Sequence, residues 1–424
     1  MIRYGSPSAE ADVAAAEPAR EQHIAPIPRV SIQAFCETPD TTGVVQVAGE
    51  DRRMSKAHLK VQTGGIAAAA EAYRSAPTPN VIIIESLSHG EDLLAGLDSL
   101  AEVCDAGTRV IVIGKLNDIV LYRELVRRGV SDYVMAPVAP LDVIRSVSGL
   151  FSAPEAKPVG RIVAVVGAKG GVGASTVAHN VAYAIARDLT LDSVVADLDL
   201  PFGTAGLDYN QDPPQGIADA VFSPERIDSG LVDRLLSKCT THLSLLAAPA
   251  TLDRVYDFST DAFDSVLDVL RASVPCVVLD VPHVWTGWAK RALIGADDIL
   301  IVASPDLANL RNAKNLIDLL RASRPNDRRP HYCLNQVGVP KRPELKPADF
   351  SKALESEPTA VIPFEPQLFG TAANNGQMIA EVAASHRASE TFRQLAQLLT
   401  GRAEVKRARS SLLSPLMDKL KRRA

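Results

Sequence analysis

A glycine-rich stretch at positions 167–176 constrains the fold of this chain more than any other feature. The apolar run 162–166 leads directly into it, and a helical pattern over 177–187 follows it. Strand, glycine-rich turn and helix in this order is the context in which a backbone wraps around a phosphate. The loop amides and the helix N-terminus then supply positive potential for an anion. The sequence therefore predicts a phosphate-binding turn within an α/β fold.

The stretch belongs to a longer series of apolar runs. Between residues 160 and 400 the expected strands are 162–166, 194–196, 243–246, 276–279, 299–302 and 332–334. Most are continuous apolar runs, as central strands of a parallel sheet are when both faces are buried. We therefore expect a P-loop domain over 160–400 with a mostly parallel central sheet.

A second series of strands and helices precedes it. Its expected strands are 30–32, 58–61, 81–84, 110–113 and 133–135, with helices such as 92–103 and 118–128 between them. This alternation predicts a flavodoxin-like α/β domain over 26–151, similar to a response-regulator receiver. Residues 152–159 contain two prolines and are expected to be a linker, residues 1–25 to be disordered, and residues 401–424 to form a basic tail.

Composition limits the setting of the chain. The hydrophobic fraction of 46% and the charged fraction of 22% are ordinary for a globular protein, and a net charge of −5 makes nucleic acid an unlikely general partner. The five cysteines are scattered, which favours reduced thiols over disulfides or zinc. The N-terminus lacks an apolar core, so we expect a cytoplasmic protein.

The loop departs from the standard pattern G-x-x-x-x-G-K-[ST] at two positions. Ala168 replaces the first glycine and Ala174 replaces the lysine. Ser175 retains the hydroxyl that would ligate Mg²⁺, and Thr176 is placed to touch the α-phosphate. A Rossmann site is disfavoured because Thr176 stands where a third glycine belongs. Downstream, the apolar run 277–279 ends in Asp280, a Walker B pattern whose carboxylate would hold Mg²⁺ through water.

Residues 169–176 resemble the deviant Walker motif K-G-G-x-G-x-[ST]-T of the MinD/ParA ATPases. The resemblance implies that ATP and Mg²⁺ bind to the chain, and that Lys169 reaches the phosphates of the partner subunit in a homodimer. It implies that Asp199 orients the attacking water and that Asp197 supports the Mg²⁺ shell. The implied magnesium residues are Ser175, Asp197 and Asp280. The implied nucleotide-binding residues are Gly170, Gly171, Val172, Gly173, Ala174, Ser175, Thr176, Asn335 and Pro363, the last two beside the adenine.

A narrower resemblance combines both predicted domains. Residues 167–180 and 197–210, behind a receiver-like domain, resemble the CpaE/TadZ family of tight-adherence (Tad, Flp, type IVc) pilus assembly proteins. This implies an ATP-binding dimeric switch that localises the pilus secretion machinery, with the secretion ATPase and inner-membrane platform proteins as partners. Hydrolysis is expected to be weak or absent because Ala174 lacks the phosphate-gripping cation. A ParA-type DNA or cargo partitioning ATPase and a nucleotide-bound structural scaffold remain open alternatives.

Two further regions complete the interpretation. Phosphotransfer by a receiver needs Asp, a hydroxyl and Lys after its third, fourth and fifth strands, where this chain has Glu85, Gly114 and Ala136. We therefore expect a pseudo-receiver that takes no phosphate. The basic tail carries leucines at helical spacing, interrupted by Pro415, and we expect it to offer a peripheral contact with the inner membrane, at a cell pole.

Overall fold

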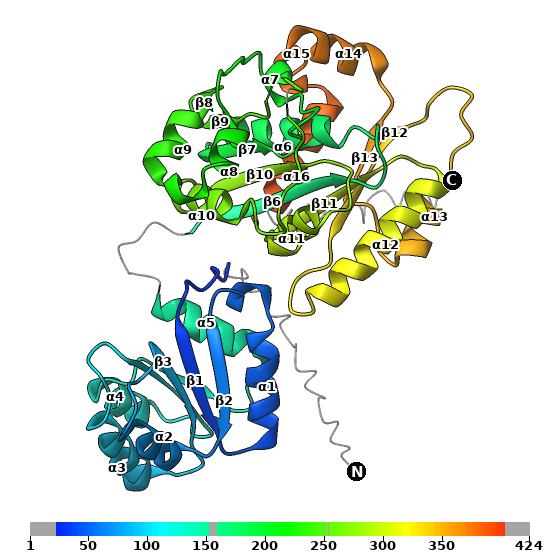
Figure 1. The fold of residues 1–424 in the computed structure, drawn as a ribbon. Coiled ribbons are helices and arrows are strands. Elements are labelled where there is room, and N and C mark those ends of the chain that lie inside the picture. Colours follow the sequence, from blue (N-terminus) through cyan, green and yellow to red (C-terminus); the bar gives the residue numbers. More distant parts are fainter. Residues whose placement is uncertain (1–22, 152–158, 250, 253, 403–424) are drawn as a thin grey trace, which may run out of the picture.

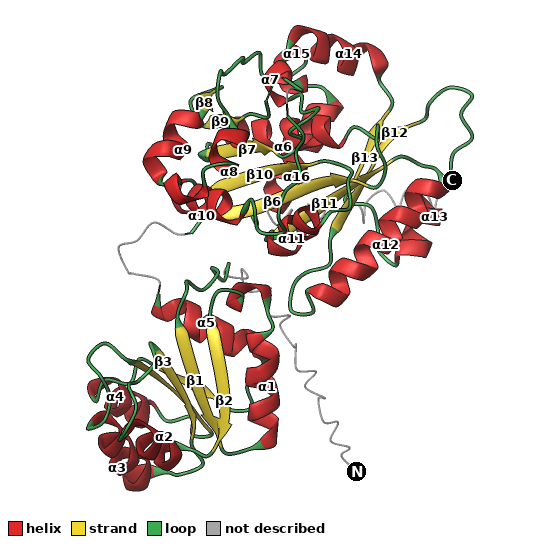
Figure 2. Cartoon of the chain, viewed as in Figure 1, coloured by secondary structure: helices red, strands yellow, loops and turns green. Residues whose placement is uncertain are grey.

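The computed structural model describes residues 23–151, 159–249, 251–252 and 254–402, and these form two α/β parts, each with its own sheet (Figures 1 and 2). The expectations for most of the N-terminus, the linker and the basic tail lie outside the described residues. Within the described ranges, no helix is long and apolar enough to cross a membrane.

The N-terminal part has five parallel strands in the order β2-β1-β3-β4-β5. This is the flavodoxin-like order, which confirms the expected fold. The strands are β1 (Ser31–Cys36), β2 (His58–Thr63), β3 (Val81–Glu85), β4 (Arg109–Gly114) and β5 (Asp132–Met135). Helices α1 (Pro39–Gly49) and α5 (Pro140–Leu150) pack on one face, and α2 (Ile66–Tyr73), α3 (Gly90–Ala101) and α4 (Ile119–Arg127) pack on the other (Figure 1).

The second part has an eight-stranded sheet in the order β13-β12-β11-β6-β10-β7-β9-β8. Only the β8–β9 pair is antiparallel among the described strands. The strands are β6 (Arg161–Gly167), β7 (Ser193–Asp197), β8 (Ser237–Lys238), β9 (Leu243–Leu246), β10 (Cys276–Val281), β11 (Asp298–Ala303), β12 (His331–Val337) and β13 (Ala360–Pro363). The strand β6 that leads into the glycine-rich loop is therefore central, between β10 and β11.

Helices cover both faces of this sheet. One face carries α8 (Ile217–Val221), α9 (Ser229–Leu235), α10 (Asp264–Ser273), α11 (Gly287–Gly295), α12 (Leu307–Ser323) and α13 (Pro347–Leu354). The other carries α6 (Ala174–Asp188), α7 (Ala205–Asp208), α14 (Pro366–Asn375), α15 (Ile379–Val382) and α16 (Arg387–Leu399) (Figure 2). The short 3-10 turns are η1 (Arg52–Met54) and η2 (Pro224–Arg226).

Two strands of this sheet depart from the expectation. The short strands β8 and β13 lie at its two edges, and neither is marked by a long apolar run. Pro363 was expected in a loop but is the last residue of β13. An edge strand tolerates proline because one of its sides needs no ladder hydrogen bond. Pro363 faces Val337 of β12, beside an irregularity in the register.

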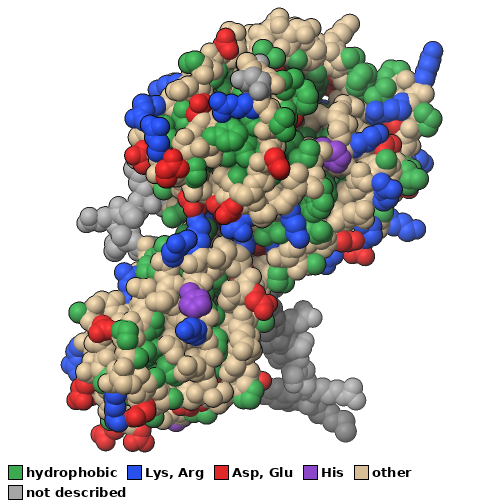
Figure 3. All heavy atoms as spheres, in the orientation of Figure 1, with side chains coloured by type: hydrophobic (Ala, Val, Ile, Leu, Met, Phe, Trp, Pro, Cys, Tyr) green, Lys and Arg blue, Asp and Glu red, His purple; other side chains and the backbone are tan. Residues whose placement is uncertain are grey.

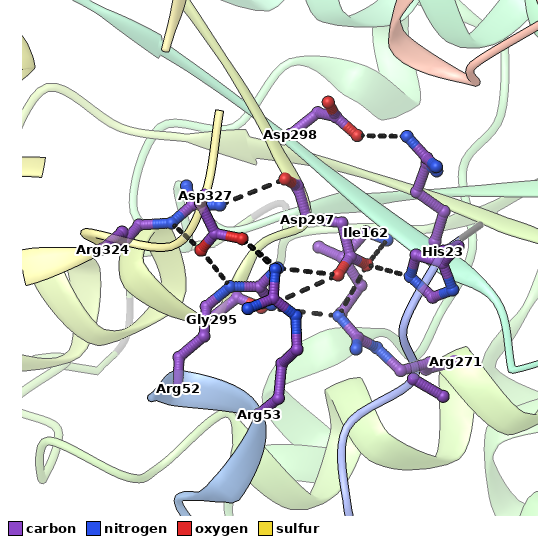
Figure 4. A network of polar contacts seen from close by, with 12 residues as sticks. His23, Arg52, Arg53, Ile162, Arg271, Gly295, Asp297, Asp298, Arg324 and Asp327 are labelled. Carbon is purple, nitrogen blue, oxygen red and sulfur yellow. Dashed lines mark hydrogen bonds and ion pairs between the residues drawn. The ribbon is translucent and has the colours of Figure 1, made fainter. Parts of the chain in front are cut away.

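A buried cluster of charges joins the two parts (Figure 4). Arg52 of η1 donates from Nε to Asp327 at 2.7 Å and from its terminal nitrogens to Asp297 at 3.2 Å. Arg53 also contacts Asp327, and Asn326 donates to Asp51 at 3.0 Å. Because buried charges are tolerated only when they are paired, this cluster holds η1 in a defined position against the second part.

The same cluster contacts the base of β6. Asp297 accepts from Ile162 N at 2.8 Å, and the neighbouring Asp298 pairs with Arg161 at 2.6 Å (Figure 4). Burial alone would raise the pKa of Asp297, but His23, Arg271 and Arg52 hold that pKa well below its usual range. Asp297 therefore remains ionised, and it connects η1 to the strand that leads into the glycine-rich loop.

Candidate nucleotide site

The glycine-rich loop connects β6 to α6 at the carboxyl edge of the sheet. Gly171 and Gly173 have φ angles of 78° and 80°, a left-handed conformation that side chains rarely adopt. A Cβ atom on Gly173 would lie 2.6 Å from Asn335 Nδ2, so glycine is also required there by space. Helix α6 begins at Ala174, earlier than the pattern predicted, and Gly173 is its N-cap. The loop therefore feeds straight into a helix N-terminus, as a phosphate site requires.

Four side chains hold the carbonyl groups of this loop. The contacts are His283 Nδ1 to Gly167 O at 2.9 Å, Asn312 Nδ2 to Ala168 O at 2.9 Å, Gln336 Nε2 to Gly171 O at 3.1 Å and Asn335 Nδ2 to Val172 O at 2.8 Å. In a planar trans peptide the N–H points away from the C=O. The N–H groups of Lys169, Val172 and Gly173 therefore point to the opposite side, where a phosphate would lie.

Asn335 is expected to contact the adenine edge, and that contact stays a prediction. In this structure its buried amide nitrogen donates to the loop at Val172 O. Its neighbour Gln336, with φ of 57°, and Asn312 of α12 make similar contacts and were not singled out by the sequence. These residues lie within β12 and α12, far from the loop along the chain, so only the fold reveals that they support the loop.

The residues expected to contact phosphate lie at the surface of the site. Lys169 is exposed, and Ser175 and Thr176 are half-buried in the first turn of α6. Ala174 is the first residue of that helix. Side-chain oxygens and a free lysine at the rim of a glycine-rich loop suit a phosphate and its counter-ion, while Ala174 contributes no charge.

The two predicted strand-end carboxylates lie side by side beneath the loop. Asp280 of β10 pairs in register with Asp197 of β7, and both are buried, with 2% and 0% exposure. Asp197 accepts from the backbone N–H of Asp199 and of Ala205, each at 3.1 Å. Among the described residues, Asp280 Oδ2 is buried without a hydrogen-bond partner. This oxygen lies 3.3 Å from His179 Nε2 without completing a hydrogen bond, so it keeps capacity for a cation or its water shell.

Asp199 lies where the chain turns away from the sheet. It is half-buried and accepts from Phe202 N at 3.3 Å. Burial, with a smaller contribution from Asp280, raises the pKa of Asp199. The segment that follows passes very close to Asp197, because a Cβ on Gly203 would lie 2.3 Å from its Oδ2. Asp197 therefore organises the segment that carries Asp199.

A histidine that the sequence did not point out completes the cluster. His179 of α6 is fully buried, and its ring nitrogens lie 2.7 Å from Asp208 and 3.3 Å from Asp280. Ligand atoms of His179, Asp197 and Asp280 all lie within 4.8 Å of one another. No spacing rule marks a single histidine inside a helix, so the sequence offered no signal for it.

Electrostatics in this cluster favour a cationic histidine. Burial opposes the charge of His179, but the carboxylates of Asp208 and Asp280 beside the ring outweigh it and raise the pKa to about 10. Burial and the nearby charge of Asp280 raise the pKa of Asp197 to about 7. The charge of His179 thus faces the carboxylates, and it does not substitute for the missing lysine at the phosphates.

Comparison with known proteins identifies the class of fold to which the second part belongs. A family model described as an AAA domain matches residues 160–328. The ParA family ATPase of Chlorobium tepidum has 24% identity and a TM-score of 0.51, covering 56% of this chain and 98% of its own. A MinD from Pyrococcus horikoshii, determined with Mg-ADP, has 18% identity and a TM-score of 0.50, covering 57% and 96%. The second part therefore has the fold of the MinD/ParA P-loop ATPases.

The sequence matches are more specific. Septum site-determining protein MinD of Synechocystis is 28% identical over 163 residues, 38% of this chain, and the match spans 60% of that relative. The pilus assembly protein CpaE of Caulobacter crescentus is 49% identical over 100% of its solved chain and 31% of this one, on the N-terminal part, with a TM-score of 0.30. On that identity, the chain belongs to the CpaE family of pilus assembly proteins, within the MinD/ParA superfamily.

Proposed function

We propose that this chain binds ATP with Mg²⁺ at the loop between β6 and α6 and acts as a dimeric switch in pilus assembly. The observation that carries the proposal is the pair of buried carboxylates under the loop, with Asp280 Oδ2 completing no hydrogen bond among the described residues. The loop amides would hold the phosphates, and Ser175, Asp197 and Asp280 would hold the Mg²⁺ shell. Bound Mg²⁺ would neutralise phosphate charge and orient the γ-phosphate.

Dimerisation is supported by the surface around the site. Large apolar side chains are exposed on segments that follow β7, β9, β10 and β11, all at the carboxyl edge of the sheet. They are Phe202, Leu207, Leu252, Val255, Val284, Trp285 and Leu307. Several exposed apolar side chains near one edge of a sheet favour a protein partner there. A second copy covering this edge would bring its Lys169 toward the bound phosphates.

Weak or absent hydrolysis forms part of the proposal. No cation extends from position 174, and His179 is engaged with Asp208 and Asp280. Fewer positive groups at the γ-phosphate stabilise less of the transition-state charge. Slow turnover suits a switch whose function depends on the lifetime of the ATP-bound form.

The proposed cellular role rests on family membership. It is to localise and help assemble the pilus secretion machinery, with the secretion ATPase and inner-membrane platform proteins as partners. The face in Figure 3 carries both acidic and basic side chains, with basic ones more frequent along the right of the second part. DNA partitioning would use a basic surface for phosphate contacts. Low-salt DNA binding by the ATP-bound protein would favour partitioning instead.

The test combines nucleotide binding with self-association. We expect the protein to bind ATP in calorimetry and to gain mass in light scattering when Mg-ATP is added. Lys169→Ala should keep its fold and lose the ATP-dependent gain in mass, because an exposed loop lysine makes no core contact. Lys290→Ala, an exposed lysine on α11, is the matched control. No heat and no thermal shift with millimolar Mg-ATP would contradict nucleotide binding.

A further inference from the structure

The buried histidine of α6 makes contacts in two directions. Its Nδ1 lies 2.7 Å from Oδ2 of Asp208, the last residue of α7, and its Nε2 lies 3.3 Å from Oδ2 of Asp280. The first contact has hydrogen-bond geometry, whereas the second is an ion-pair distance in which neither atom completes a hydrogen bond. One ring therefore spans from the Walker B strand β10 to a helix that follows the β7 turn.

The backbone around this ring reinforces the same connection. Tyr209, next to Asp208, donates from its hydroxyl to the carbonyl of His179 at 2.7 Å, and the two rings lie 5.5 Å apart. At the other end of α7, Ala205 N donates to Asp197 at 3.1 Å. Helix α7 is thus held at both ends by residues of the carboxylate cluster.

The segment between β7 and α7 carries Asp199, the residue proposed to orient water. It runs from β7 to α7 and approaches Asp197 so closely that only glycine fits at position 203. Any shift of the Asp280 carboxylate would alter its contact with His179. Because the same ring is bonded to Asp208, the shift would also alter the position of α7. The positions of the metal carboxylate and of the water-orienting segment are therefore mechanically linked.

We infer that His179 is a positioning residue that aligns the Asp280 carboxylate for Mg²⁺ and ties α7 to that alignment. The inference rests on the proposed function, since it assumes that Mg-ATP binds above Asp280. Groups that orient a metal-bound carboxylate commonly change metal affinity or activity by roughly 10-fold to 100-fold when they are removed. His179 itself need not touch nucleotide or metal.

Two substitutions separate the two contacts of the ring. In His179→Asn the amide nitrogen stands near the place of Nδ1, so the contact with Asp208 is retained and that with Asp280 is lost. In His179→Gln the amide nitrogen stands near the place of Nε2, so the contact with Asp280 is retained and that with Asp208 is lost. Asp208→Asn changes the outer partner, whose side chain is 19% exposed and therefore tolerates substitution better than the ring.

The measurement is the ratio of the ATP dissociation constant in EDTA to that in excess Mg²⁺. We expect His179→Asn to lower this ratio by roughly 10-fold or more, His179→Gln to stay closer to wild type, and Asp208→Asn to fall between them. ATP affinity in EDTA should stay unchanged in all three. Hydrogen exchange of the α7 amides should rise most in His179→Gln and Asp208→Asn. A purely structural histidine would affect stability but would leave the ratio and this order unaltered.

A second histidine–aspartate pair provides the control. His242 Nδ1 lies 2.7 Å from Asp192, at the same distance but on the surface and away from the loop. His242→Asn should reproduce wild-type values. If both His179 variants and Asp208→Asn keep the wild-type ratio, the positioning role is wrong while ATP binding stands. If wild type binds no ATP with or without Mg²⁺, the proposed function itself fails.

Discussion

The two parts of the molecule place a carboxylate in the same architectural position and treat it in opposite ways. Glu85 ends β3 and Asp280 lies near the end of β10, each on a central strand of a parallel sheet. Glu85 accepts from Thr38 N, Glu37 N, Thr38 Oγ1 and Thr41 Oγ1 at 2.6–2.8 Å. Asp280 Oδ2 has no hydrogen-bond partner within the described residues. Both side chains are buried, but four donors hydrogen-bond to Glu85, whereas Asp280 Oδ2 has an ion-pair contact with His179 at 3.3 Å and completes no hydrogen bond within the described residues.

The difference indicates whether the carboxyl edge of each sheet is open to a ligand. A carboxylate satisfied by four protein donors has little capacity left for a metal or a phosphoryl group. Tyr133 also closes the carboxyl edge of the sheet in the N-terminal part. Its hydroxyl accepts from Leu116 N at 3.1 Å and leaves no space for a Cβ on Gly114. The N-terminal part therefore uses its strand end for stability, and the second part leaves its strand end with fewer protein donors, as the proposed Mg²⁺ site requires.

Removing Glu85 should have the largest effect on stability. Glu85→Ala leaves buried hydroxyl and amide donors unsatisfied, and each such group costs about 1–3 kcal/mol. We expect a loss of about 3 kcal/mol or more in the free energy of unfolding, measured by denaturant titration with circular dichroism. Glu102→Ala, an exposed carboxylate after α3, should change stability by less than about 0.5 kcal/mol. Equal small changes in both variants would contradict the structural role of Glu85.

The same carboxylate predicts a pH dependence. Burial would raise the pKa of Glu85, but hydrogen bonds from Thr41, Thr38 and Glu37 outweigh it and lower the pKa below 4.5. A lowered pKa means that the unfolded chain takes up the proton more readily, so this stabilisation is present above pH 4.5 and is lost as pH falls through the folded value. The difference in the free energy of unfolding between wild type and Glu85→Ala should therefore decrease as the pH falls below 4.5. A difference that increases over this range would contradict a lowered pKa for Glu85.

Neutralising Asp280 should have a smaller effect on the fold and a clear effect on binding. Asp280→Asn keeps the side-chain shape and removes a like charge beside Asp197, while His179 keeps Asp208 as a partner. We expect the free energy of unfolding to change by about 1 kcal/mol or less. The thermal shift with Mg-ATP should fall toward the value in EDTA. If Asp280→Asn destabilises as much as Glu85→Ala, both carboxylates are structural and the comparison fails.

The sequence predicted most of the fold because the central strands are long apolar runs. It missed β8 and β13 because both edge strands are short, β8 is polar and β13 ends in a proline. It located Asp197 and Asp280 because strand ends are visible in the pattern, and their register confirms that they meet. It could not locate His179 or the charge cluster of Arg52 with Asp297, since those contacts join residues far apart in the chain. Their partners are determined by tertiary packing, for which local periodicity carries no information.

The last prediction is a null result at the N-terminal strand end. Treatment with a small phosphodonor and Mg²⁺ should leave the mass of the protein unchanged, because Glu85 is saturated with donors and Ala136 offers no cation for a phosphoryl group. Glu85→Asp is the sharper version of the test. It supplies the residue type that receivers phosphorylate, but the shorter side chain withdraws from Thr38 and Thr41 and still has no lysine opposite it. We therefore expect Glu85→Asp to lose stability and to gain no adduct by mass spectrometry. A stable adduct on wild type would show that the strand end is open after all, and the contrast with Asp280 would then have to rest on something other than hydrogen-bond saturation.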